Sequence, residues 1–208
     1  MRHIITIIAT LFSISVSFGQ SQIRQENETA EMFANRLKPD STEIAHTVIE
    51  TPKLDTSKNV IIAFYKKTIY EVRQMKTYVD HSQYDIMLGY MFIPTSDKNY
   101  ERIFIDTIPP DGGDPEIISI FFANADKDKN KELIVLCKYE QRHYDYDGDL
   151  YETYIFDYYK DKMQFKYLSK LSEKFLGCDC GWRNGKTETA KYKTAKAIKT
   201  KLKKLGFY

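Results

Sequence analysis

Short runs of apolar residues, many of them β-branched or aromatic, follow one another along most of the chain after residue 59. Residues 59–65 (NVIIAFY) form one such run, and residues 100–108 alternate between the two faces that a strand presents. Prolines and glycines between residues 94 and 113 separate several of these runs. The pattern predicts strands over residues 59–65, 86–93, 100–108, 117–123, 132–139, 150–159 and 163–168.

Three segments follow a different pattern. Apolar residues recur at helical spacing over residues 30–37, and Pro39 ends that segment, so we expect a short helix there. A second helix is expected over about residues 187–205, where Ile198 and Leu202 lie on one apolar face. The pattern of residues 68–77 is compatible with either a helix or a strand.

These elements predict an α+β fold, mainly an antiparallel β-sheet with a short N-terminal helix and a basic amphipathic C-terminal helix. The chain of 208 residues is long enough for one β-rich domain over residues 44–208, preceded by a polar segment over residues 20–43. Aromatic residues make up 14% of the chain, which suits strands. The net charge of only +2 does not favour nucleic acid as a partner.

The C-terminal region that contains the expected helix is strongly basic. Nine Lys or Arg residues and a single acid, Glu188, lie between Arg183 and Tyr208. Two interpretations remain open. The helix packs on the sheet and exposes a solvated basic face, or it forms a docking surface for an acidic partner or an anionic envelope polymer.

The first residues are typical of an export signal. A short basic start at Arg2 precedes an apolar run over residues 4–18, which is too short for a comfortable membrane span. Small residues allow cleavage before Gln20, so residues 1–19 are predicted to be a signal peptide; a retained anchor is the alternative. We expect an exported protein, periplasmic or secreted, with no transmembrane span in the mature chain.

If the protein is exported, its three cysteines can form disulfides. An oxidising compartment permits a disulfide, and a bond from Cys137 to Cys178 or Cys180 would link the sheet to the C-terminal segment. Free buried thiols and a metal site at the C-x-C pair are the alternatives.

A polar loop at residues 124–132 (NADKDKNKE) places oxygen-bearing side chains at every second position before the strand that starts with Leu133. Hard cations such as Ca²⁺ prefer six to eight oxygen ligands from a compact backbone. An EF-hand register fails, because it puts Lys131 where glycine is needed and Cys137 where a bidentate glutamate is needed. A solvated polar turn between two strands is the simpler alternative.

In a register that starts at Asn124, the loop resembles the calcium loop of FG-GAP and VCBS-type repeats. The resemblance covers about a dozen residues in one copy, and Asn124 and Lys129 depart from the Asp and Gly that this family prefers. It implies Ca²⁺ as a ligand and a propeller-like or half-propeller arrangement of the sheet. The metal ligands that it implies are Asn124, Asp126, Asp128, Asn130, the last through its carbonyl, and Glu132.

The sequence Asp147-Gly148 lies between two aromatic-rich runs, which predicts a tight hairpin turn there, with a second ion site as the alternative. The turn is also the best candidate for a protruding loop that contacts a partner. Its candidate binding residues are His143, Tyr144, Asp145, Tyr146, Asp147 and Asp149.

The chain holds no G-x-S-x-G elbow, H-E-x-x-H pair, phosphate loop or dinucleotide-binding glycine pattern. We therefore expect a non-catalytic exported binding protein with one structural calcium loop. Small exported proteins with such loops include inhibitors and immunity proteins, so the resemblance implies a protein partner such as a delivered toxin or a cell-wall-degrading enzyme. A small hydrolase acting on envelope polymers and a structural envelope component are the alternative classes.

Overall fold

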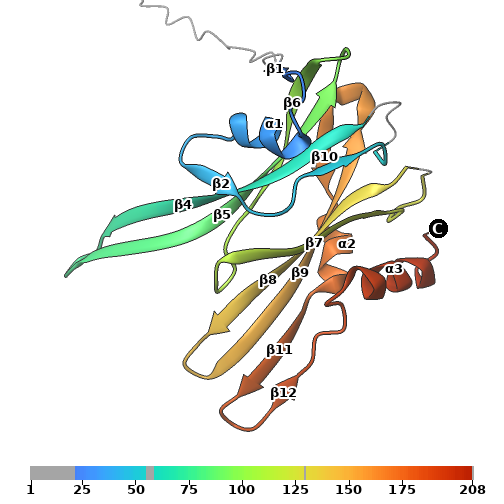
Figure 1. The fold of residues 1–208 in the computed structure, drawn as a ribbon. Coiled ribbons are helices and arrows are strands. Elements are labelled where there is room, and N and C mark those ends of the chain that lie inside the picture. Colours follow the sequence, from blue (N-terminus) through green and yellow to red (C-terminus); the bar gives the residue numbers. More distant parts are fainter. Residues whose placement is uncertain (1–21, 55–58, 129, 208) are drawn as a thin grey trace, which may run out of the picture.

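The structure is a computed structural model that describes residues 22–207 except 55–58 and 129. The predicted signal peptide therefore lies outside the described residues. Two antiparallel sheets of six strands each dominate this part of the chain, and both curl (Figure 1). The prediction of a mainly antiparallel β-sheet is confirmed.

The first sheet is built mostly from the N-terminal half of the chain. Its strands follow the order β1-β6-β5-β4-β2, and β3 pairs with β4 beside β2. Its strands are β1 (Gln22–Ile23), β2 (Thr42–Ile44), β3 (Ile49–Thr51), β4 (Val60–Gln74), β5 (Val79–Pro94) and β6 (Asn99–Ile108).

The second sheet is built from the C-terminal half. Its order is β12-β11-β9-β8-β7, and β10 pairs with one part of β9 while β11 pairs with another. Its strands are β7 (Pro115–Ala123), β8 (Glu132–Arg142), β9 (Tyr146–Tyr159), β10 (Gln164–Tyr167), β11 (Gly177–Trp182) and β12 (Thr187–Glu188).

The two sheets share one apolar core, because alternate residues of a strand point to opposite faces. Val60, Ile62 and Phe64 of β4 lie in one buried cluster with Leu133 and Val135 of β8. Each described sheet has six strands that pack over this common core, and no four-stranded blade repeats in this part of the chain. The propeller-like arrangement that the resemblance implied is therefore not seen.

Short helices cover the outer faces of both sheets. Helix α1 (Ala30–Arg36) packs through Phe33 on β4 of the first sheet. Helix α3 (Ala195–Lys204) packs through Ile198 and Leu202 on the second sheet, beside α2 (Ser169–Ser172). The 3-10 turns η1 (Lys160–Lys162) and η2 (Glu173–Phe175) complete the described elements. No helix in the described ranges is long and apolar enough to cross a membrane.

The C-terminal helix begins later than predicted. Residues 187 and 188, where the helix was expected to start, instead form β12 and pair with β11. The helix starts at Ala195, and the side chain of Thr194 accepts a hydrogen bond from the Ala197 amide as its N-cap. Pairing with β11 therefore makes residues 187–188 a strand, although the sequence predicted a helix there.

The predicted hairpin between β8 and β9 is confirmed, but it turns before Asp147, so the placement of its turn at Asp147-Gly148 is wrong. Residues 143–145 make the turn, and Gly148 pairs with Gln141 on one side and Cys180 on the other. Gly148 has φ +145°, and a Cβ there would lie 2.1 Å from the Asp179 carbonyl oxygen. The glycine is needed for this close approach of β11 and not for a tight turn.

The segment before α1 is held by a carboxylate that is nearly buried. The side chain of Glu28 accepts hydrogen bonds from Arg36 Nε at 2.7 Å, Arg36 Nη2 at 2.8 Å and the Gln25 amide at 2.8 Å. The hydrogen bonds from Arg36 lower the pKa of Glu28 more than burial raises it. The ion pair therefore ties the start of the helical segment to its end.

We expect acid to remove the contribution of Glu28 to stability. Its folded pKa is below the unfolded value of 4.5, so the contribution is present above that pH and lost as the pH falls below it. At neutral pH, Glu28→Gln should lower the free energy of unfolding by about 1.5–3 kcal/mol, the scale of hydrogen bonds to charged groups. Urea unfolding at several pH values measures this. Glu31→Gln, at an exposed position of α1, is the control; an equal loss for both variants would contradict the prediction.

Candidate cation site and binding surface

The loop between β7 and β8 is held by its own polar side chains. The Asp128 amide donates to Asp126 Oδ1 at 2.8 Å, and the Asn130 amide donates to Asp128 Oδ1 at 2.7 Å. Asn124 Nδ2 donates to the Asp128 carbonyl oxygen at 2.6 Å. Side chains of Asn and Asp that bond backbone groups two residues ahead are typical of tight turns. The spacing of polar residues in the sequence thus produces a compact loop.

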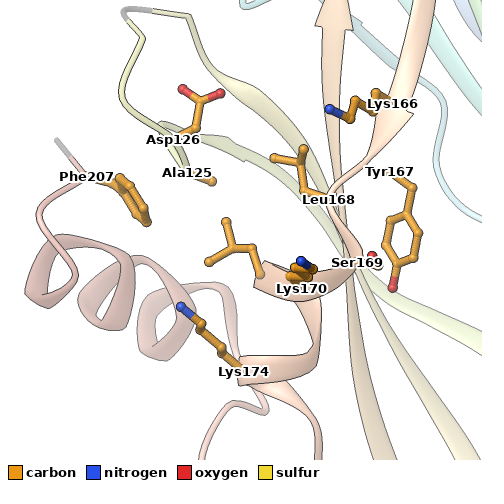
Figure 2. A pocket seen from close by; sticks show the side chains of 10 residues that line it. Ala125, Asp126, Lys166, Tyr167, Leu168, Ser169, Lys170, Lys174 and Phe207 are labelled. Carbon is orange, nitrogen blue, oxygen red and sulfur yellow. The ribbon is translucent and has the colours of Figure 1, made fainter.

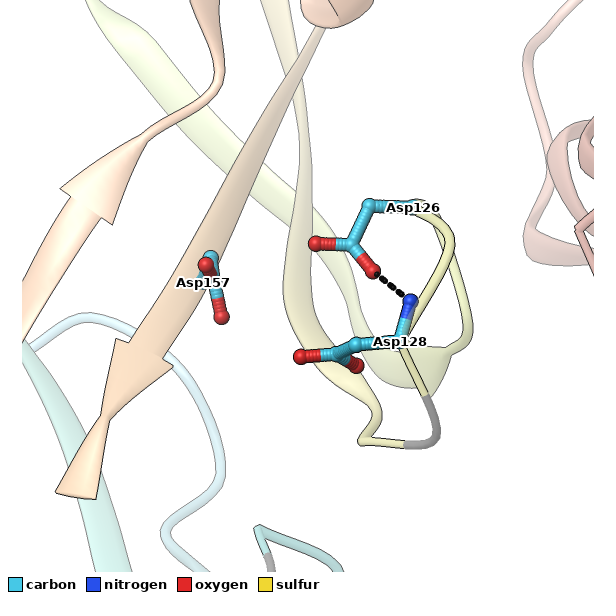
Figure 3. Close-up of side chains that lie close together, drawn as sticks. All are labelled: Asp126, Asp128 and Asp157. Carbon is cyan, nitrogen blue, oxygen red and sulfur yellow. Dashed lines mark hydrogen bonds between the residues drawn. The ribbon is translucent and has the colours of Figure 1, made fainter.

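Three carboxylates converge beside this loop (Figure 3). One oxygen each from Asp126, Asp128 and Asp157 lies within 4.8 Å of the others. The first two come from the loop, and the third comes from β9, the strand next to β8 in the second sheet. The pKa of Asp157 is raised, first by burial and then by the charges of Asp126 and Asp128. Such crowding of carboxylates is unfavourable unless a cation lies among them.

Glu132 lies at the base of the same loop and is fully buried. Its Oε2 accepts a hydrogen bond from the Ala125 amide, but its Oε1 has no partner. Burial raises the pKa of Glu132 to about 8, with further contributions from Asp126 and Asp128. Because Leu133 pairs with Phe156, the register places Glu132 and Asp157 at the same level of the sheet. A buried oxygen without a partner is costly and is a natural cation ligand.

The cluster opens into a cavity of about 310 Å³. Asp128, Asn130 and Asp157 line one part of it, and residues 158–162 line the rest. Its walls therefore offer carboxylate and amide oxygens, which Ca²⁺ and Mg²⁺ prefer, and they also carry Lys160 and Lys162.

Asp126 also borders a larger pocket of about 710 Å³ (Figure 2). Leu168, Leu171 and Phe207 give this pocket an apolar lining, and Lys166, Lys170 and Lys174 also line it. The larger pocket is mostly apolar, whereas the smaller cavity is lined by acids, lysines and tyrosines.

The structure brings together only part of the predicted ligand set. Asp126 and Asp128 meet as predicted, and Glu132 lies buried beneath them. The Asn130 side chain donates to Asp128 Oδ2 at 3.1 Å, so it positions that carboxylate. Two buried oxygens have no hydrogen-bond partner: Oδ1 of Asn124 and Oε1 of Glu132. Sequence reasoning missed Asp157, although an acid between Phe156 and Tyr158 in a buried aromatic run was a usable signal.

The predicted partner-binding residues lie at one end of the second sheet. The ring of Tyr146 stacks on His143 at 4.3 Å and on Trp182 at 5.6 Å between centroids. Tyr144 is 82% exposed, and the Arg183 guanidinium lies 4.1 Å from its ring centre. The aromatic end, as we call residues 143–146 with 182–183, is also joined by a hydrogen bond from the Arg183 amide to the Asp145 carbonyl oxygen. Trp182 and Arg183 were not predicted to belong to this surface.

The acids of the predicted loop do not form one cluster. Asp145 is in the turn, whereas Asp147 and Asp149 are in strand β9. Asp147 pairs with Arg142 of β8, and Asp149 pairs with Asp179 of β11. These pairings distribute the three acids along the hairpin.

The cysteines do not pair as predicted. Cys178 and Cys180, on β11, are bonded to each other, with their Cα atoms 5.3 Å apart. Cys137 is free and buried in the core between the sheets. No disulfide therefore links Cys137 to the C-terminal segment; instead, Asp179 anchors that segment by accepting hydrogen bonds from Lys193 Nζ at 2.5 Å and the Ala190 amide at 2.7 Å.

Comparisons with known proteins do not extend these assignments. The chain matches no protein-family model, and searches of curated proteins and of solved structures gave no match.

Proposed function

We propose that this protein is a non-catalytic binding protein that holds a structural Ca²⁺ ion in the loop between β7 and β8. The observation that carries the proposal is the convergence of Asp126, Asp128 and Asp157, two from the loop and one from β9. Glu132, with a buried oxygen that has no protein partner, supports it independently. Ca²⁺ fits this donor set because it accepts many oxygen ligands in flexible geometry.

The cation would act on the shape of the second sheet. It would join the loop before β8 to β9, and β9 continues to the aromatic end. Neutralising the three carboxylates would remove their mutual repulsion and hold the loop against the sheet. In this proposal the ion positions binding residues and takes no part in a reaction.

The aromatic end is the proposed binding surface. Tyr and Trp supply large contact areas at low entropic cost, and Arg is common at the energetic centres of interfaces. Tyr144 and Arg183 are exposed there, while Tyr146 and Trp182 are half-buried and held by stacking. The resulting surface combines rigid rings with charges of both signs, which suits a protein partner.

The partner class follows from the calcium-loop resemblance alone. We propose a delivered toxin or a cell-wall-degrading enzyme as the partner, so that the protein acts as an immunity protein or inhibitor in the periplasm or outside the cell. Affinity capture with the mature protein from its own cells and from neighbouring cells tests this. Recovery of one stoichiometric enzyme or toxin is expected.

A matched pair of variants makes the capture experiment specific. Tyr144→Ala combined with Arg183→Ala should reduce recovery of the partner at least tenfold, the scale of losing one or two central interface residues. Phe104→Ala combined with Arg102→Ala removes an exposed aromatic ring and an arginine from β6 of the first sheet, away from the aromatic end. Equal recovery by both double variants would place the binding surface elsewhere.

Calcium binding is tested separately by titration calorimetry on the mature protein. We expect a single site with a Kd of roughly 10⁻⁴ to 10⁻³ M, the range of extracellular modules. Asp157→Asn should weaken binding about as much as Asp126→Asn does, because both belong to the cluster. Binding that is lost with Asp126→Asn and kept with Asp157→Asn would confine the site to the loop.

A further inference from the structure

The hairpin of β4 and β5 extends well beyond the rest of the first sheet (Figure 1). On one side, β2 pairs with β4 only as far as Lys67; on the other, β6 pairs with β5 only from Met87. Between these limits, residues 68–74 and 79–85 pair only with each other among the described strands. We call this two-stranded projection, residues 68–85, the arm.

The arm exposes large apolar side chains. Tyr70 is 75% exposed and Val72 is 64% exposed, and the tip adds Met75, Tyr78 and Val79. Tyr70 and Val72 are separated from Phe64 by even numbers of residues, so their side chains lie on the same face of β4. Where β4 packs in the two sheets, this face forms the shared core. Near the tip, no described element covers this face.

The edge of this projection has two charged residues, Glu71 and Arg73, but lacks most of the usual protections of a sheet edge. A two-stranded hairpin alone is marginally stable in water, and an unpaired strand edge is a template for another strand. Proteins often protect such edges with proline, lysine or bulges. Residues 68–74 (TIYEVRQ) contain no proline, glycine or lysine, and their pairing with β5 is regular. The edge of β4 is therefore able to accept a strand.

We infer that the occupant is a second copy of this chain, whose β4 edge pairs antiparallel with that of the first copy. The two-fold axis would pass between Val72 of one copy and Val72 of the other. Pairing of identical edges satisfies the backbone groups of both copies at once, as closed two-fold symmetry requires.

The charges of the edge select this register. Glu71 and Arg73 pair within one chain at 2.8 Å, and in this register each also lies opposite the other residue of the second copy, so the contact forms twice. Opposite charges on facing residues stabilise a sheet, and like charges destabilise it. A slip of one residue would exchange the two faces of the arm. The nearest registers that keep the faces matched are centred on Glu71 or on Arg73, and each puts two like charges opposite each other.

The same register assembles the exposed apolar side chains. Val72 faces Val72, and Tyr70 of each copy lies beside them on the same face, because alternate residues share a face. Tyr70 lies opposite Gln74 of the second copy, so the pairing covers residues 70–74 of both chains. Lys67, where β2 ends its pairing, would lie beyond the tip of the other arm. The bodies of the two copies therefore lie on opposite sides of the paired arms and do not meet.

Sedimentation equilibrium of the mature protein tests this inference. We expect a concentration-dependent dimer with a Kd in the micromolar range at low salt, because the contact is small. Glu71→Arg alone should raise the Kd of the dimer about tenfold or more, since it places arginines opposite each other twice. Combining Glu71→Arg with Arg73→Glu should restore the wild-type Kd.

Two further variants separate arm pairing from other association. Val72→Lys places two ammonium groups at the axis and should also produce monomers. Leu176→Lys changes a side chain that is 50% exposed away from the arm and should leave the dimer intact. A protein that stays monomeric up to ~1 mM, above any specific weak dimer, overturns the inference. So does a dimer that Glu71→Arg leaves unchanged, or one that the charge exchange does not restore.

Discussion

Replacing Leu202 by aspartate is expected to unfold the domain or to leave it barely stable. Leu202 is 1% exposed and belongs, with Ile198 and Phe175, to the apolar cluster between α3 and the outer face of the second sheet. Truncation of a buried leucine costs about 2–5 kcal/mol through lost transfer energy and the cavity left behind. A carboxylate at this position adds the cost of burying a charge. The sum approaches the entire stability of an ordinary domain.

Chemical unfolding followed by circular dichroism measures this effect. Leu202→Ala keeps the site apolar and should lower the free energy of unfolding by about 2–4 kcal/mol while the protein remains folded. Lys203→Asp, on the exposed face one residue later, should change it by no more than about 0.5 kcal/mol. If Leu202→Asp and Lys203→Asp behaved alike, α3 would not be docked in solution.

The result also separates the two interpretations of the basic helix. Ile198 and Leu202 are buried, whereas Lys196, Lys199 and Lys203 are exposed. The apolar face is therefore used inside the protein, and the lysines form a solvated face. Any binding of acidic partners would have to use these exposed lysines and should weaken with salt.

Calcium is expected to raise the stability of the protein by about 2.7 kcal/mol when its concentration is a hundredfold above Kd. The ion would bind Asp126, Asp128 and Asp157 only when the loop and β9 lie together, so it favours the folded state over the unfolded chain. With a Kd of about 10⁻⁴ M, calcium at about 10 mM reaches this condition. Thermal unfolding in calcium and in chelator measures the increment.

Variants at the cluster should remove this increment. Asp128→Ala and Asp157→Ala each delete a carboxylate of the cluster, so their unfolding curves in calcium and in chelator should coincide. Asn130→Ala should keep the increment, because the side chain of Asn130 only orients Asp128. Asp97→Ala, an exposed acid between β5 and β6, controls for a general effect of charge. Identical wild-type curves in calcium and in chelator would leave the loop as a polar turn.

Local sequence patterns were enough to locate most of the secondary structure. The β-branched and aromatic runs became strands, since such residues pack well on a pleated surface. The segment from Thr29 to Arg36 contained its own cap and apolar spacing, and it is helical. The compact acidic loop also followed from sequence, because its hydrogen bonds join residues only two to four positions apart.

Features that depend on contacts between segments distant in the sequence were decided by the tertiary structure. Residues 68–74 were compatible with a helix or a strand, and pairing with β5 made them a strand. The close approach of Asp179 placed Gly148 within a strand and moved the turn to residues 143–145. The disulfide formed between neighbours on β11, while Cys137 was buried in the core.

The candidate sites show the same division. Sequence spacing alone was sufficient to nominate Asp126 and Asp128, because both are on one loop. Asp157 joins them only through the register of β8 and β9, and Trp182 joins Tyr146 only because β11 pairs with β9. The physical reason is range: hydrogen bonds within a turn depend on a few neighbouring residues, whereas the register of paired strands depends on the packing of the whole core.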